Sequence, residues 1–128
     1  MNTISFLLNL AVTVIFLALT IRSGKKGARK SHFYLVALTL LALLGAIWQA
    51  EMYGRDFVFD SVRLSVHLGF AFAALLCFPG VVFSGFKLIS APNWRLAHNR
   101  WVGAFVSLVG FAVLTAIWMF LDAQSKAQ

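Results

Sequence analysis

The sequence has few of the groups from which active sites and metal sites are usually built. It contains one cysteine, three histidines and four acidic residues among 128 residues. The single cysteine, Cys77, excludes an intrachain disulfide and a cysteine-rich metal site, and its plainest interpretation is a small packing residue. No nucleophile–base pair, carboxylate pair or phosphate-binding loop can be assembled, and neither Ser84 nor Ser90 has a predicted base. The sequence therefore favours a protein without independent catalytic activity.

Apolar residues, in contrast, are in large excess. They make up 61% of the chain and raise the mean hydropathy to +0.86, well above what the core of a small soluble domain requires. Four stretches reach the roughly 20 mostly apolar residues that a membrane-spanning helix needs. They are Ile4 to Ile21, Phe33 to Ala50, Leu64 to Phe83 and Trp101 to Leu121. We predict an all-α integral membrane four-helix bundle, a single domain over residues 1–128 with helices at 3–22, 31–53, 61–89 and 94–122.

The charged residues predict how these helices cross the bilayer. Two connections carry basic residues and no acid: the first holds Arg22, Lys25, Lys26, Arg29 and Lys30, and the third holds Lys87, Arg95 and Arg100. By the positive-inside rule, loops one and three are cytoplasmic and both the N-terminus and the C-terminus are outside. This pattern explains the net charge of +7 as a feature of topology, so we expect the lipid bilayer and no nucleic acid as a partner. Because no span carries a charge at mid-depth, a channel or transporter is also disfavoured.

Several residues predict where the helices begin and end. Ser31 is the expected N-cap of the second helix, which Gly54 should terminate. Asp60 and Asn93 are the expected N-caps of the third and fourth helices. With these limits His98 lies inside the fourth helix.

Small residues follow one face of the third helix and part of the fourth. The first set is Gly69, Ala73, Cys77, Gly80 and Ser84, and the second is Gly103, Ser107 and Gly110. Tight helix packing and a flat cofactor lying against the face are both open interpretations, and the bend expected at Pro79 fits either. A faint internal symmetry pairs His32 and Gly45 with His98 and Gly110, as a parallel repeat of two hairpins would.

The three histidines are candidate functional residues, because an ionisable side chain in or beside a membrane span is costly. His32 and His98 are predicted at the cytoplasmic ends of their helices, whereas His67 lies near the outer end of the third helix. At a rise of about 1.5 Å per residue, the stretch from His67 to Ser84 separates the two levels by about 25 Å. One metal ion therefore cannot bind all three imidazoles.

A haem b held between His32 and His98 agrees with this arrangement, since neutral imidazole is a good iron ligand. Lys30, Arg95 and Arg100 would then supply cations for the haem propionates. The alternative is that both histidines are interfacial residues that begin helices among other basic groups.

His67 also has two interpretations. It could ligate a second haem, with Met52 or Met119 as the other ligand and Arg63, one turn earlier, paired with a propionate. It could equally be a polar group whose hydrogen bonds are satisfied by a neighbouring helix.

Three short segments support a resemblance to a known family. KSHF at residues 30–33, VHLGFA at 66–71 and HNRWVG at 98–103 occur in that order on successive predicted helices. The chain thereby resembles the bacterial four-helix membrane family that includes a maturation factor for haem-copper cytochrome c oxidase, and more distantly cytochrome b561-like haem membrane proteins. The resemblance spans Ala28 to Leu121 and implies that His32, His67 and His98 are metal-ligating positions, although Asn99 departs from the family's helix-four signature.

The resemblance implies a function as well. It indicates a haem-linked protein of the bacterial cytoplasmic (inner) membrane that assists assembly of a respiratory complex or carries electrons. The alternative function is a non-catalytic accessory subunit, which would bind a respiratory or other membrane complex through its small-residue helix faces.

Overall fold

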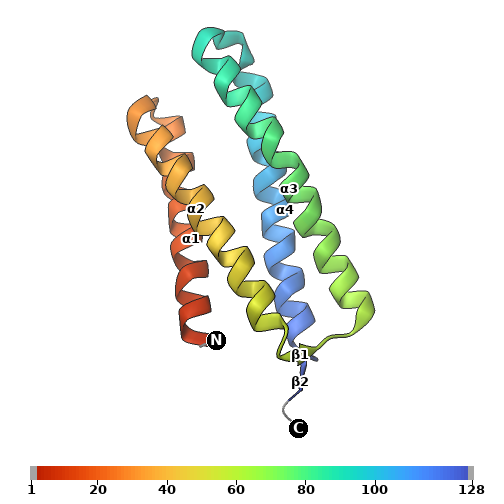
Figure 1. Cartoon of the computed structure of the whole chain (residues 1–128). Helices are drawn as coiled ribbons and strands as arrows, with labels where there is room; N and C mark the ends of the chain where they lie inside the picture. The colour runs from red at the N-terminus through yellow and green to blue at the C-terminus, as the bar shows by residue number, and fades with distance from the viewer. Residues whose placement is uncertain (1–2, 127–128) are drawn as a thin grey trace. The chain divides into compact units, whose positions relative to one another are not determined.

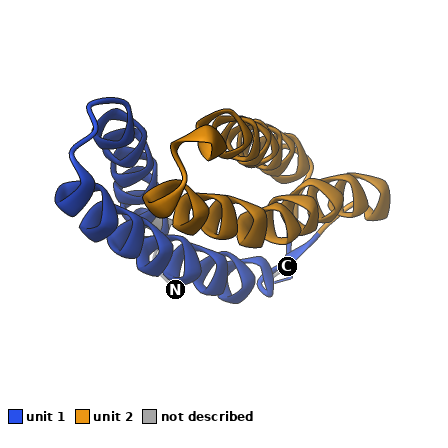
Figure 2. Cartoon of the chain, turned by 90° about the horizontal axis from the view of Figure 1, so that it is seen from above, with its two compact units in different colours: residues 1–58, 125–128 blue, residues 59–124 orange. Residues whose placement is uncertain are grey.

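The computed structural model describes residues 3–126, which are almost entirely helical. They divide into two compact units (Figure 2), one comprising residues up to 58 together with those from 125, and the other residues 59–124. Each unit is built around one pair of antiparallel helices. The prediction of a single domain over residues 1–128 concerns the association of these units and stays a prediction.

The first unit is a hairpin of α1 (Thr3–Lys25) and α2 (Arg29–Gly54), joined by three residues (Figure 1). Gly27 allows this tight turn, since its φ of +70° is a left-handed conformation that glycine adopts without steric cost. The N–H of Ala28 then donates to the carbonyl of Ser23 at 3.1 Å, the bond that characterises a Schellman motif. The turn thus satisfies the last carbonyls of α1 while returning the chain directly into α2.

This turn also explains why the predicted start of the second helix is wrong. The N-cap is Ala28, whose carbonyl accepts from the N–H of His32 at 2.9 Å, so Ser31 already lies within α2. The other end agrees with the prediction, because Gly54 is the last residue of α2.

The second unit begins with α3 (Ser61–Ser90), the longest helix in the described part of the chain. The predicted N-cap is confirmed: the carboxylate of Asp60 accepts a hydrogen bond from the N–H of Arg63 at 3.0 Å. The helix continues through Pro79.

The predicted cap of the fourth helix is wrong. Asn93 lies within a 3-10 turn, η1 (Pro92–Trp94), and α4 (Arg95–Phe120) follows directly. Pro92 favours this turn because it sits at a first helical position, where its missing N–H is not needed. The N–H of Trp94 donates to the carbonyl of Ala91 at 3.1 Å, so backbone groups close the turn without a capping side chain.

Two short strands complete the described elements. β1 (Phe57–Val58) pairs with β2 (Gln124–Ser125) in a two-stranded ladder. In the first unit, the N–H of Lys126 donates to the carbonyl of Asp56 at 3.0 Å, and its ammonium donates to the carbonyl of Arg55 at 2.7 Å. These contacts hold Lys126 against the loop that follows α2.

Side-chain hydrogen bonds link the helices of the first hairpin. The amide of Asn9 donates to the side chain of Gln49 at 3.0 Å, and the hydroxyls of Thr20 and Thr39 lie 2.8 Å apart. Such short polar links are typical of helices that pack in apolar surroundings.

The outer surfaces of both hairpins are apolar. The buried positions are occupied largely by small side chains, whereas Leu41 and Leu76 are 67% and 80% exposed. Exposing so much leucine side chain to water is unfavourable, because apolar surface is more stable in apolar surroundings. By length and composition, each of the four helices is able to cross a membrane, which agrees with the predicted all-α fold.

Candidate functional site

His32 lies in the first turn of α2 and contacts the last turns of α1. Its Nδ1 is 3.0 Å from the carbonyl oxygen of Thr20 and 3.1 Å from the hydroxyl of Ser23. Because a carbonyl oxygen only accepts, Nδ1 carries a proton, and the lone pair of the neutral ring is then on Nε2. A Cβ added to Gly24 would lie 3.1 Å from Cε1 of the imidazole, so this glycine allows the ring to lie close to α1.

His98 occupies the equivalent place in the second hairpin, in the first turn of α4. Its Nδ1 lies 3.0 Å from the hydroxyl of Ser84, a side chain with 0% of its surface exposed. That hydroxyl donates its single hydrogen to the carbonyl of Val81 at 3.0 Å and therefore accepts from the N–H at Nδ1. A Cβ added to Gly85 would lie 3.3 Å from Cε1 of the imidazole.

The two hairpins thus hold a histidine in the same way. In each hairpin, a Ser-Gly pair lies near the end of the first helix, and the histidine is the fourth residue of the second helix. The serine hydroxyl lies against Nδ1 of the imidazole, and the glycine lies next to its Cε1. The internal symmetry predicted from the sequence pairs His32 with His98 but does not include the Ser-Gly pairs. The reason is spacing, since the serine precedes the histidine by nine residues in the first hairpin and by fourteen in the second.

The contact at Ser84 corrects one expectation, because this serine does have an imidazole beside it. A nucleophilic serine must donate its hydroxyl hydrogen to the base. Here the hydrogen goes to the carbonyl of Val81, and the side chain is closed to solvent. The hydroxyl therefore positions the ring of His98 and is not arranged as a nucleophile.

His67 is anchored on α4 within the second hairpin. Its Nδ1 lies 3.0 Å from the carbonyl oxygen of Ala112 and 3.5 Å from the hydroxyl of Thr115, so Nδ1 is again the donor. This is the contact expected for a polar group satisfied by a neighbouring helix. A role as ligand of a second haem, with Met52 or Met119, stays a prediction.

The cations expected near His32 and His98 are exposed. Lys30 precedes the first histidine by two residues, while Arg95 and Arg100 flank the second on α4. Exposed cations beside an anchored imidazole are compatible with binding the carboxylates of a cofactor.

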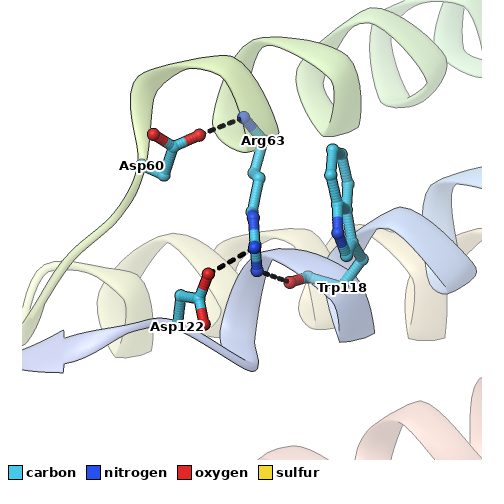
Figure 3. A network of polar contacts seen from close by, with 4 residues as sticks. All are labelled: Asp60, Arg63, Trp118 and Asp122. Atoms are coloured by element: carbon cyan, nitrogen blue, oxygen red, sulfur yellow. Dashed lines mark hydrogen bonds and ion pairs between the residues drawn. The ribbon is translucent and has the colours of Figure 1, made fainter.

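Arg63, in contrast, has partners within its own hairpin (Figure 3). Its guanidinium pairs with the carboxylate of Asp122 and donates to the carbonyl of Trp118 at 3.0 Å. The same group lies 5.0 Å from the centre of the Trp118 ring. These contacts tie the start of α3, which Asp60 caps, to the end of α4. His98 lies in the first turn of α4, at the other end of that helix. The predicted pairing of Arg63 with a propionate would have to compete with Asp122.

The small-residue faces differ in what covers them. On α3, a Cβ added to Gly80 would come within 2.5 Å of the Trp101 ring, and the Cys77 thiol lies 3.7 Å from the Trp101 carbonyl oxygen. This part of the face therefore packs tightly against α4. On α4, added Cβ atoms at Gly103 and Gly110 would meet nothing within 4 Å in the described part of the chain, so the helix-four face is open.

Comparison with known proteins gives no match to any family model, curated protein or solved structure. Among residues 3–126, no group of three or more His, Cys, Asp or Glu side chains is placed to hold a metal ion. The anchored histidines and the charges around them are therefore the candidate functional groups.

Proposed function

We propose that the chain is a multi-pass membrane protein that holds a b-type haem between His32 of α2 and His98 of α4. The two basic connections lie in the cytoplasm and both termini lie outside. Four helices of sufficient length and apolar composition support membrane insertion, and the separation of basic from acidic residues supports the orientation.

The observation that carries the haem proposal is the matching anchorage of the two imidazoles. Each donates from Nδ1 to a partner on the preceding helix, which directs the lone pair of the neutral ring to Nε2. Histidines that bind metals characteristically donate their other ring N–H to an oxygen in this way, because the contact selects the tautomer and orients the ring. The donor set therefore fits iron ligation.

The surrounding residues fit the rest of the cofactor. The exposed ammonium of Lys30 and the exposed guanidinium groups of Arg95 and Arg100 would neutralise the propionates at the membrane surface. A haem held there would supply one-electron chemistry or, as a transferable group, a cargo for oxidase assembly. On this basis we propose that the protein assists assembly of a respiratory haem-copper oxidase or carries electrons in the bacterial cytoplasmic membrane.

An absorption spectrum tests the haem proposal directly. Protein purified from haem-supplemented cells should show a Soret band, and the band should be lost in His32→Ala and in His98→Ala. Thr39→Val is the control, since it removes a polar contact between helices at a residue outside the proposed haem ligands. Colourless wild-type protein, or pigment that survives both His32→Ala and His98→Ala, would contradict the proposal.

The open face of α4 favours a second candidate function, a non-catalytic accessory subunit of a respiratory or other membrane complex. Gly103 and Gly110 leave room for another helix to approach closely. Replacing both glycines with leucine should then release the protein from its complex, whereas His98→Ala should leave the association intact. The opposite pair of results would reject this function.

A further inference from the structure

The end of the first hairpin carries an unusual density of positive charge. Two basic residues lie in the last turn of α1, one in the connection and two in the first turn of α2, and all five are exposed. They are Arg22, Lys25, Lys26, Arg29 and Lys30. Because the turn at Gly27 joins the helices through only three residues, the cations of both helices share one small surface. We refer to these five residues as the basic tip.

The first unit provides no nearby carboxylate to balance this charge. Among the described residues of this unit, α1 has no acidic residue, the first turn of α2 has none, and Asp56 lies beyond the far end of α2. Glu51 is paired with Arg55 and follows Lys30 by 21 positions along α2, which is about 32 Å at the rise of an α-helix. The repulsion among five close cations is therefore relieved only by anions from outside the unit.

The residues just below the basic tip indicate what kind of anion fits. Phe33 and Tyr34, in the first turns of α2, are 48% and 74% exposed. Aromatic rings at this level are typical of the zone between headgroups and acyl chains. An anionic phospholipid would place its phosphate among the cations and its acyl chains along the exposed apolar side chains beneath them. A soluble phosphate compound would contact only the cations and would leave the apolar side chains beneath them uncovered.

We infer that the basic tip binds anionic phospholipids of the leaflet in which it lies. The inference rests on the membrane insertion proposed above and is independent of haem. The corresponding end of the second hairpin is less suited to binding anionic lipids, because it has only three basic residues instead of five. One of them, Lys87, also has its ammonium over the ring of Phe83, 5.7 Å from the ring centre. Lipid selectivity should therefore come mainly from the first hairpin.

Electron paramagnetic resonance of spin-labelled lipids tests this inference with the full-length chain. The chain is reconstituted in phosphatidylcholine vesicles that contain a trace of spin-labelled phosphatidylglycerol or spin-labelled phosphatidylcholine. The motionally restricted fraction should be larger for phosphatidylglycerol, and added salt should reduce the difference. Because both leaflets have the same composition, the orientation of the reconstituted protein does not affect the measurement.

A neutralised variant and a matched control locate the effect. Each basic residue near an anionic surface contributes a factor of about five, so K25Q/K26Q/R29Q/K30Q should lower the phosphatidylglycerol preference by about five-fold or more. K87Q/R95Q/R100Q, which neutralises the basic end of the other hairpin, should lower it less, because this end has fewer cations and Lys87 lies over the ring of Phe83. The charge-conserving variant K25R/K26R/K30R should keep the preference, which separates loss of charge from misfolding.

Three results would overturn the inference. The wild-type chain would restrict both labelled lipids equally, the control would lose as much preference as the neutralised variant, or millimolar inorganic phosphate would abolish the preference and thereby indicate a site for soluble phosphates. Failure of the proposed function gives different results. Extraction of the chain from membranes by alkaline carbonate would reject insertion itself, and a missing Soret band would reject haem without affecting lipid selectivity.

Discussion

Replacing Gly80 with alanine introduces one methyl group where α3 lies close against Trp101 of α4. The new Cβ would lie 2.5 Å, 2.6 Å and 2.6 Å from three atoms of the Trp101 indole, well inside van der Waals contact. A fused ring cannot give way by rotating its far end alone, so the whole indole must turn or the helices must separate. Trp101 is 43% exposed, which allows the ring to swing outward at the cost of its contact with α3.

Two opposing effects set the size of the change. Forcing an extra methyl group into a packed contact typically costs about 1–3 kcal/mol. Alanine in place of a helical glycine gains up to about 1 kcal/mol. We therefore expect Gly80→Ala to lower the free energy of unfolding of the second hairpin by about 1–2 kcal/mol. Gly69→Ala, on the same helix, meets nothing within 4 Å among the described residues and should stabilise the chain by up to about 1 kcal/mol.

The measurement is unfolding in mixed micelles, followed by far-ultraviolet circular dichroism as the denaturing detergent is increased. Gly80→Ala should unfold at a lower detergent fraction than the wild type, and Gly69→Ala at the same fraction or a higher one. The double variant G80A/W101L should recover much of the loss, since the contact is shared by the two residues. Equal stability of the two alanine variants, or purely additive effects in G80A/W101L, would refute the packing argument.

Three further predictions concern polar contacts and use the same unfolding measurement. Asp60→Ala removes the N-cap of α3 and should cost about 1 kcal/mol, whereas Asp60→Asn should cost a few tenths, because asparagine also caps helices. Arg63→Leu should destabilise the second hairpin more than Asp122→Asn, because only the arginine also donates a hydrogen bond to the Trp118 carbonyl. The cost of Asp122→Asn should stay below about 1 kcal/mol. Equal costs for the two variants would assign the whole effect to the ion pair. Thr39→Val should cost about 0.6 kcal/mol through loss of its link to α1, and an unchanged unfolding midpoint would show that this hydroxyl contact contributes nothing.

Local rules were sufficient for much of the fold. Stretches of about 20 apolar residues have few alternatives to a helix, because an unpaired backbone is costly in apolar surroundings. Asp60 caps the start of α3 and Gly54 is the last residue of α2, as predicted, since such signals depend on the residue itself and its immediate neighbours. The predicted N-caps at Ser31 and Asn93 were wrong, because the turn at Gly27 and the 3-10 turn at Pro92 determine where α2 and α4 begin.

The histidine sites depended on contacts that no local rule contains. His32, His67 and His98 were recognisable from the sequence because ionisable groups are rare in such apolar segments. Their partners were not, since Ser23, Ser84 and the backbone at Ala112 become neighbours only when two helices pack side by side. The connection between Ser84 and His98 is five residues longer than that between Ser23 and His32, yet both serines reach Nδ1 of their imidazole.

The amino-acid sequence alone determined the chemical character of each segment: four apolar helices, two basic connections and three imidazoles near helix ends. Composition and periodicity carry that information directly, because solvent preference is a property of each side chain. Only the tertiary structure decided which ring nitrogen of each histidine is anchored, which glycine lies beneath an indole and which arginine is paired. These outcomes depend on the rotation and spacing of two packed helices, where a shift of one residue would replace every contact by another.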